Sequence, residues 1–401
     1  MKVLILNAGS SSLKYQLIDM DGEKLLAKGL VERIGIEGSK ISQKVNGKVF
    51  ELETPMETHT DGIQLMLKAL ADPDKGAVKS MSEIGAVGHR VLHGGERFTA
   101  SVLVNDEVKE AIRANIPLGP LHNPANLMGI EACEKVMPGT PNVAVFDTAF
   151  HQTMPPKAFL YGVPMEYYER LKVRRYGFHG TSHRYVSKRA CEFLNLDRKT
   201  TRVITCHLGN GSSLAAVEGG KCVDTSMGIT PLEGVLMGTR SGSMDPAVVQ
   251  FIANNEKLTV NEVLDILNKK SGLLGISGLS SDMRDVDAAA DSGDRRAIIA
   301  RDMLVAGIRK YIGSYAAVMN GVDVIVFTAG IGENNADLRE RVMQGFEFLG
   351  AKLDPQKNKT RQEAIISTDD SKVKIVVIPT DEEIVIARDT LCIVEGRKIE
   401  D

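Results

Sequence analysis

Glycine and small hydroxyl residues follow apolar runs at three places in the sequence, residues 7–12, 207–212 and 330–334. Glycine lets the backbone approach a bulky anion, and the successive N–H groups of such turns form a concave anion site. The first two turns also resemble each other, because each continues as Ser-Ser-Leu. We therefore expect these turns to hold the phosphates of a nucleotide, with Lys14 adding a positive charge.

Arginine and histidine side chains lie in or beside glycine- and proline-rich segments at four positions, Arg90, His122, His179 and Arg240. A guanidinium group binds two oxygens of a carboxylate or phosphoryl group at once. Catalytic groups also tend to lie on loops of a rigid scaffold. The set is expected to bind a substrate and the group that is transferred to it.

Carboxylates follow two further apolar runs, as Asp147 and as the pair Glu382-Glu383. Phosphoryl transfer needs magnesium, whose preferred ligands are oxygens of this kind. A carboxylate after a strand can instead cap the next helix, and for Glu382 this is the interpretation we favour.

Several classes of protein are disfavoured. The sequence has no GxxxxGK[ST], no complete GxGxxG after a strand, no GxSxG and no HExxH. His179 and His183 have the spacing of a zinc pair without the intervening glutamate, so a zinc site there is not expected. With 49 Lys and Arg against 52 Asp and Glu, the net charge of −3 argues against a nucleic-acid binder.

The composition also predicts the cellular compartment of the protein. Its five cysteines form no CxxC pair, which favours a reducing cytoplasm over a disulfide framework. The apolar run near Met1 is too short for a signal peptide, and no run approaches the ~20 residues of a membrane helix.

Apolar runs alternate with helical patterns, which is typical of an α/β protein. We expect strands at residues 2–7, 13–19, 84–88, 142–146, 202–208, 213–218, 323–328 and 373–378. Residues 41–60 are expected to form a small hairpin or a surface excursion, and residues 294–320 a helix with one apolar face. The similar strand-turn-strand segments near residues 7 and 207 predict a duplicated unit. The boundaries expected are 1–149 and 150–383, with a C-terminal helix, about 384–401, packing back on the first domain.

Taken together, these motifs of the sequence resemble those of the acetate kinase family. The resemblance rests on residues 7–14, 88–96, 146–151, 177–183, 207–214, 239–242, 330–334 and 380–383, and so covers nearly the whole chain. It implies duplicated ribonuclease H-like domains, as in actin-like ATPases, around a nucleotide cleft. It also implies reversible transfer of a phosphoryl group from ATP to acetate by a homodimeric, cytoplasmic enzyme that uses Mg²⁺, with Mn²⁺ as a substitute. One departure is Asp381, where many members have Asn.

The resemblance also implies roles for individual residues. Asp147, His179 and Arg240 would be catalytic, Arg90 and His122 would bind the substrate, and Asn7 and Glu383 would bind the metal. Phosphate-binding residues would be Ser10, Ser12, Lys14, His207, Leu208, Gly209, Asn210 and Gly211. Adenosine-binding residues would be Asp282, Met283, Arg284, Gly330, Ile331, Gly332, Glu333 and Asn334. The acyl pocket would be lined by Leu92, Leu121, Phe178 and Pro231.

Asp147 is the residue that the family treats as an acid or base. Because acetate is already ionised at neutral pH, we expect Asp147 to orient magnesium waters or an arginine instead. Two other functions stay open. One is a propionate or butyrate kinase of the same family, and the other is a non-enzymatic, ATP-driven clamp of the actin and chaperone type.

Overall fold

The computed structural model describes residues 1–120 and 122–399. Residue contacts divide the chain into two units, the first formed by residues 1–150 and 381–401 and the second by residues 151–380. The domain boundaries expected from the sequence, 1–149 and 150–383, stay a prediction. The independent folding of each unit stays a prediction.

The first unit is built on a mixed sheet with the strand order β5-β4-β3-β2-β1-β6-β8-β7. Its strands are β1 (Lys2–Ala8), β2 (Ser12–Asp19), β3 (Lys24–Glu32), β4 (Lys40–Val45), β5 (Lys48–Glu53), β6 (Ile84–Val91), β7 (Val102–Leu103) and β8 (Asn142–Phe146). Its helices are α1 (His59–Leu70), α2 (Asp106–Ala114), α3 (Asn123–Val136) and α14 (Glu382–Val394). The hairpin expected at 41–60 is confirmed as β4 and β5, which extend this sheet.

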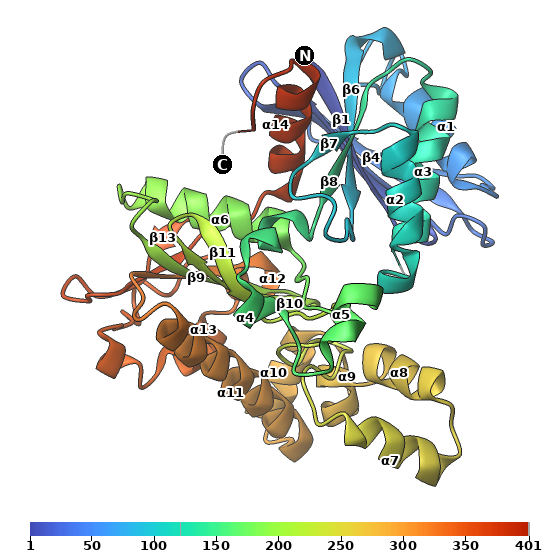
Figure 1. The fold of residues 1–401 in the computed structure, drawn as a ribbon. Coiled ribbons are helices and arrows are strands. Elements are labelled where there is room, and N and C mark those ends of the chain that lie inside the picture. The colour runs from blue at the N-terminus through green and yellow to red at the C-terminus, as the bar shows by residue number, and fades with distance from the viewer. Residues whose placement is uncertain (121, 400–401) are drawn as a thin grey trace. The chain divides into compact units, whose positions relative to one another are not determined.

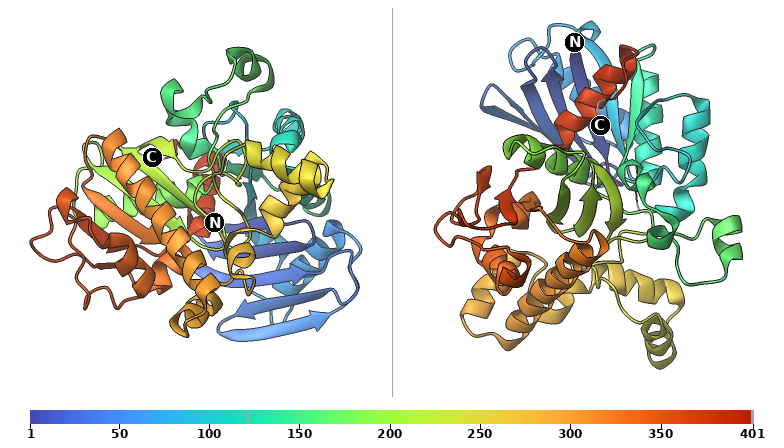
Figure 2. Two further views of the ribbon diagram at one scale, coloured as in Figure 1. Left: turned by 90° about the horizontal axis from the view of Figure 1, so that it is seen from below. Right: turned by 60° about the vertical axis from the view of Figure 1, so that its left-hand side comes forward.

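Helices cover both faces of the first sheet. Apolar residues of alternate strand positions, such as Leu4 and Leu13, face α1 and α3 in one core. On the other face α14 lies across β1, β6 and β8, as Figure 2 shows for the red helix on the blue sheet. Gly88 of β6 permits this contact, because a Cβ there would lie 2.5 Å from Thr390 Oγ1. The C-terminal helix α14 therefore packs on the first sheet.

The second unit repeats the plan with the strand order β11-β10-β9-β12-β14-β13. Figure 1 labels β9, β10, β11 and β13 of this sheet. Its strands are β9 (Arg202–Leu208), β10 (Ser212–Glu218), β11 (Lys221–Thr225), β12 (Val324–Thr328), β13 (Ala364–Ile365) and β14 (Lys374–Val377). Its helices are α4 (Pro156–Phe159), α5 (Met165–Leu171), α6 (Gly180–Phe193), α7 (Ala247–Glu256), α8 (Val260–Lys269), α9 (Gly272–Ser277), α10 (Met283–Asp291), α11 (Arg295–Val318), α12 (Ala329–Asn334) and α13 (Ala336–Met343).

The duplication expected from the sequence is confirmed by the pairing of the strands. In the first unit β1 pairs antiparallel with β2 and parallel with β6, which pairs parallel with β8. In the second, β9 pairs antiparallel with β10 and parallel with β12, which pairs parallel with β14. The two glycine turns therefore occupy the same place, between the first two strands of each sheet. The fold is α/β, as expected.

The two faces of the second sheet differ in polarity. Ile204, Cys206 and Leu208 of β9 join a large apolar core with Leu304 and Ile308 of α11. The alternate β9 positions carry the side chains of Thr205 and His207 on the opposite face, which is covered by α6. A buried polar layer therefore lies between β9 and α6. Among the described residues, no helix is long and apolar enough to cross a membrane.

His89 of β6 gives the fold a measurable pH dependence. It is 3% exposed, and its Nε2–H donates to Asn142 Oδ1 at 2.7 Å. Burial lowers the pKa of His89 from 6.5 to about 4, although the bond to Asn142 opposes this. Between these values the unfolded chain binds a proton that the folded chain does not, so the free energy of unfolding falls as the pH falls.

We expect this one group to remove about 3 kcal/mol of stability between pH 7 and pH 4. His89→Gln keeps a donor for Asn142 but does not titrate. Urea unfolding at both pH values should show that the variant loses about 3 kcal/mol less than the wild type. Equal losses in the two proteins would mean that His89 is not buried in its neutral form.

Candidate functional site

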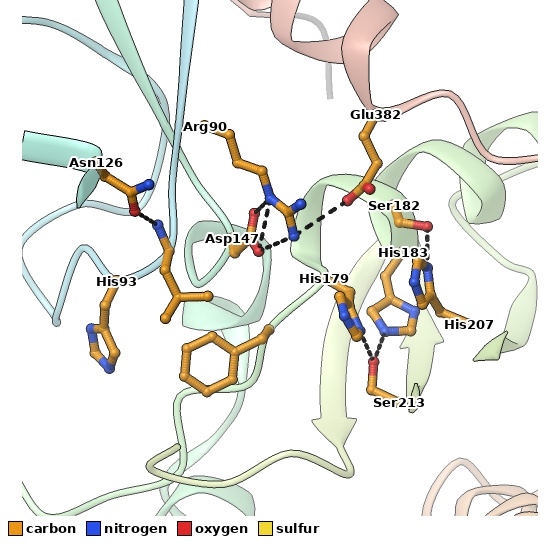
Figure 3. Close-up of polar contacts among 12 residues, drawn as sticks. Arg90, His93, Asn126, Asp147, His179, Ser182, His183, His207, Ser213 and Glu382 are labelled. Atoms are coloured by element: carbon orange, nitrogen blue, oxygen red, sulfur yellow. Dashed lines mark hydrogen bonds and ion pairs between the residues drawn. The ribbon is translucent and has the colours of Figure 1, made fainter. Parts of the chain in front are cut away.

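In the first unit, Arg90 and Asp147 form a tight ion pair. Arg90 lies near the end of β6, and Asp147 follows β8, the adjacent parallel strand. The Nε of Arg90 donates to both carboxylate oxygens at 3.1 and 3.3 Å, and its terminal nitrogen donates to Oδ2 at 2.8 Å (Figure 3). The negative charge of Asp147, and then that of Glu382, raises the pKa of Arg90. Since Asp147 is fully buried and both its oxygens accept from Arg90, it holds the guanidinium in one orientation.

The start of α14 corrects one expectation. Asp381, and not Glu382, caps this helix, because Asp381 Oδ1 accepts from the N–H of Ile384 at 3.0 Å. Glu382 Oε1 lies 4.0 Å from Arg90 and is buried with no hydrogen-bond partner among the described residues. Asp381 takes this place because aspartate is among the residues preferred at helix N-caps and glutamate is not.

Asn7, Lys14 and Glu383 line one cavity of the first unit, of about 350 Å³. Asn7 and Lys14 are directly paired across β1 and β2, and Glu383 is in the first turn of α14. Burial and the charges of Glu382 and Asp381 raise the pKa of Glu383. The cavity therefore brings together Asn7 and Glu383, which were expected at the metal, and Lys14, which was expected at the phosphates.

These residues fit a magnesium ion. The amide oxygen of Asn7 and the carboxylate of Glu383 are hard oxygen donors that line the same cavity. Mg²⁺ needs only one or two carboxylates from a protein when phosphates and waters supply the rest. No group of three or more His, Cys, Asp or Glu residues that could hold a metal occurs in the described part of the chain.

The remaining predicted residues of the first unit lie near the ends of β1 and β6. Ser10 is exposed in the glycine turn and Ser12 begins β2. Leu92 is 8% exposed and its N–H donates to Asn126. His122 is the residue before α3. Leu121 lies outside the described residues.

In the second unit, Arg240 is a largely buried cation with no acidic partner. Its guanidinium donates to the carbonyl oxygen of Pro231 at 3.3 Å, and no carboxylate of the described residues pairs with it. Burial lowers the pKa of Arg240. Buried charges are normally paired, so an arginine left in this state indicates a site for an anion.

His179 lies beside Arg240 at the second glycine turn. A Cβ on Gly211 would lie 3.5 Å from a terminal nitrogen of Arg240 and 3.6 Å from Nε2 of His179. The absence of that carbon leaves both groups access to the turn. His179 has a φ of 56° where it precedes α6, and its ring stacks on that of His207 with centroids 4.1 Å apart. Strained backbone of this kind is concentrated at functional sites.

The turn between β9 and β10 is held by backbone hydrogen bonds, one within the turn and one from Gly238. Gly209 N–H donates to the carbonyl of Gly211 at 3.1 Å, and Gly238 N–H donates to the carbonyl of Asn210 at 3.0 Å. Leu208 is buried in the apolar core, so its side chain cannot reach a ligand. The backbone of this turn, together with His207, is the part that a phosphate can meet.

The residues predicted at adenosine are in two helices. Asp282 caps α10 and is paired with Arg284, whose side chain is 90% exposed, whereas Met283 is buried in the core. Residues 330–334 belong to the short helix α12 and not to an open turn. The carboxylate of Glu333 accepts from the N–H groups of Ala329 and Thr380 at 2.8 and 3.1 Å, so it is used internally.

The residues predicted to line the acyl pocket belong to different units of the chain. Phe178 is 1% exposed in the second unit, where its carbonyl contacts His151. Pro231 is the acceptor of Arg240, and Leu92 belongs to the first unit. Their grouping around an acyl chain stays a prediction.

Sequence reasoning missed the side chains that position this site. Asn126 of α3 accepts from Leu92 and donates to the carbonyl of Ala8, which joins the ends of β6 and β1. Ser182 bonds both His207 Nδ1 and Thr380 Oγ1 at 2.8 Å. His183 and Ser213 form a further network with His179 (Figure 3). The four-residue spacing of His179 and His183 places both rings on Ser213, a pairing that resembles a zinc pair in sequence alone.

Comparison with known proteins gives a consistent result. A profile of the Acetokinase family matches residues 2–388. The chain is 60% identical over 397 residues to the acetate kinase of Treponema denticola, covering 98% of this chain and 100% of that protein. Its structure matches that of Porphyromonas gingivalis acetate kinase with a TM-score of 0.95 and 50% identity, covering 98% and 99% of the two chains.

A solved propionate kinase from Francisella tularensis is also similar, with a TM-score of 0.91 and 43% identity over 97% of this chain and 99% of that one. The matches extend over nearly the whole chain and include the segments that carry Arg90, Asp147, His179 and Arg240. The chain belongs to the acetokinase family.

Proposed function

We propose that the chain is an acetate kinase, which transfers the γ-phosphoryl group of ATP to acetate and forms acetyl phosphate and ADP. The observation that carries the proposal is Arg240, a largely buried cation without an acidic partner among the described residues, beside His179 at a glycine turn. Membership of the acetokinase family and the names of relatives at 57–60% identity support the choice of acetate.

The chemistry needed is mainly neutralisation of charge. An acetate oxygen attacks the γ-phosphorus while the bond to the bridging oxygen of ADP breaks. Both reactants are anions, and charge spreads over the equatorial phosphoryl oxygens in a loose transition state. Arg240 and His179 would stabilise these oxygens, since fixed donors act most strongly where charge develops.

Arg90 would bind the carboxylate of acetate. Its pairing with Asp147 leaves part of the guanidinium for a second anion and fixes the direction of that part. Because acetate needs no deprotonation at neutral pH, Asp147 would act through Arg90 and not as a base. His122 would assist in binding the substrate.

The nucleotide and the metal would use the remaining predicted residues. Lys14, Ser10, Ser12 and the turn from His207 to Gly211 would contact phosphates, and the exposed groups of residues 282–284 and 330–334 would contact adenosine. Asn7 and Glu383 would hold Mg²⁺ or, in its place, Mn²⁺. When bound, the metal would screen the charge of the phosphates.

The direct test is a series of carboxylic acids assayed with the purified chain, ATP and magnesium, with trapping of the acyl phosphate as hydroxamate. We expect kcat/KM to be highest for acetate, lower for propionate and lower again for butyrate. A maximum at propionate would assign the chain to the other named activity of similar proteins. No turnover of any acid would reject the proposal.

Leu92 is proposed to limit acyl length. Its side chain is 8% exposed and lies close to Gly119, where a Cβ would be 3.3 Å from Leu92 Cδ2. Leu92→Ala removes apolar volume, so the ratio of kcat/KM for propionate over acetate should rise about tenfold, the value of one methylene. Val108→Ala, a buried truncation on α2, is the control and should leave the ratio unchanged. An unchanged ratio in Leu92→Ala would remove this residue from the pocket.

We also propose a homodimer in the cytoplasm. The proposal rests on the family resemblance, and the five cysteines, all described, are free thiols. Sedimentation of the purified chain should give twice the mass of 43.5 kDa.

A further inference from the structure

Three buried side chains form a continuous chain of hydrogen bonds that ends at His179. Thr205 of β9, His183 of α6 and Ser213 of β10 are each fully buried. His183 Nδ1 lies 2.7 Å from Thr205 Oγ1, and His183 Nε2 lies 2.8 Å from Ser213 Oγ. Ser213 Oγ lies 2.8 Å from His179 Nδ1, and Figure 3 shows both rings directed at this oxygen.

The protons in this chain cannot be placed independently. Complete burial lowers the pKa of His183 well below its usual value, so its ring is neutral and has one N–H and one acceptor nitrogen. Ser213 and Thr205 have one hydroxyl proton each. One of these hydroxyls must therefore donate to His183 and the other must accept from it.

Two arrangements satisfy this condition. In the first, Thr205 donates to His183 Nδ1, His183 Nε2–H donates to Ser213, and Ser213 donates to His179 Nδ1. In the second, every bond is reversed, and the hydroxyl proton of Thr205 is left with the carbonyl of Ala215 at 3.4 Å. We favour the first because it places the protons of Thr205, His183 and Ser213 each in a bond of 2.7 or 2.8 Å, whereas the second leaves the Thr205 proton in a contact of 3.4 Å.

The surroundings of His179 favour a neutral ring. With Nδ1 as an acceptor, the neutral ring has its proton on Nε2, the atom that lies with Arg240 around the open position of Gly211. The groups that face the histidines are Arg240, His207, stacked on His179, and His151, whose ring centroid is 5.6 Å from that of His183. An added positive charge on His179 would be opposed by Arg240.

We propose that Thr205, His183 and Ser213 are positioning residues that hold His179 as the neutral tautomer protonated on Nε2. This ring then donates a hydrogen bond to the transferred phosphoryl group without having to be an imidazolium ion. The inference rests on the proposed function for the identity of the acceptor. The tautomer itself is independent of that function.

The first experiment reads the tautomer directly. Long-range ¹H–¹⁵N correlation spectra of the ¹⁵N-histidine-labelled full chain, assigned with a His179→Gln variant, distinguish protonated from unprotonated ring nitrogens. We expect Nδ1 of His179 to be unprotonated and Nε2 protonated at pH 7.5. A protonated Nδ1 would overturn the proposal whether or not the chain phosphorylates acetate.

The second experiment changes the far end of the chain, which does not contact His179. Thr205→Val removes the hydroxyl at nearly constant volume, and Thr205→Ser retains it. We expect Thr205→Val to give a mixture of His179 tautomers and to lower kcat about tenfold or more, the scale on which removing a group that orients a ligand acts. Thr205→Ser should keep the wild-type spectrum and kcat.

Ser213→Ala should lower kcat at least as much as Thr205→Val, with the KM values of ATP and acetate little changed. Ser187→Ala is the matched control, because Ser187 is a buried hydroxyl of α6 that donates to the carbonyl of Arg184. It should leave kcat and the tautomer unchanged. A Thr205→Val protein with the wild-type tautomer and kcat would show that the chain of bonds is only structural.

Discussion

Replacing Arg240 with alanine should lower kcat by roughly 10³, the scale of an arginine that acts on a transferring phosphoryl group. The KM of acetate should change little, because an interaction made in the transition state lowers kcat and kcat/KM together. Arg240→Lys should recover only part of the loss, since an ammonium group cannot reproduce the guanidinium fork. Steady-state kinetics of the three proteins measures this.

Stability provides an independent check on the same variant. Arg240 has no acidic partner among the described residues, so its removal leaves no unpaired carboxylate. The Tm of Arg240→Ala should therefore be equal to that of the wild type or higher. Thr239→Ala, a neighbouring change in the same loop, should keep kcat within about threefold. A raised acetate KM at unchanged kcat in Arg240→Ala would contradict the role given to Arg240.

Asp147→Asn should lower kcat/KM for acetate by about 10² or more, the scale of losing one fixed group of a catalytic site. The cause is loss of the charge that holds Arg90, since both oxygens of Asp147 accept from that guanidinium. The pH profiles of wild type and variant should have the same shape between pH 6 and 9, because no proton is removed from acetate.

The double variant Arg90→Ala/Asp147→Asn separates an indirect from a direct role. If Asp147 acts through Arg90, the double variant should be no less active than Arg90→Ala alone, since residues that work as a unit are strongly non-additive. If the losses of activity in the two single variants instead multiply in the double variant, Asp147 has a role independent of Arg90. A limb of the wild-type pH profile that disappears in Asp147→Asn would show that it acts as a base.

Most of the fold could be predicted because its signals are local. The apolar runs that became β1, β6, β8, β9 and β12 are each bounded by glycine or polar residues. The helix expected at residues 294–320 is confirmed as α11, residues 295–318, with Leu304, Ile308 and Ile312 in the core. The duplication was readable because the two glycine turns retain similar sequences in equivalent places.

The site was less predictable because it depends on which side chains meet after folding. Arg90 and Asp147 are 57 residues apart, and their pairing follows only from the adjacency of β6 and β8. The motif around Met283 did not indicate that this side chain would be buried in the core. The bonds of Ser213 to two histidines required the pairing of β10 with β9 and the packing of α6, which no local pattern encodes.

Phosphorus-31 NMR of the purified full chain tests the central claim most directly, because it shows every phosphorylated species at once. With ATP, magnesium and acetate we expect acetyl phosphate and ADP to appear in equal amounts, and with acetyl phosphate and ADP we expect ATP to form. Without acetate the ATP signals should persist. Release of inorganic phosphate from ATP at the same rate with and without acetate, and no acetyl phosphate, would contradict the account and indicate an ATPase instead.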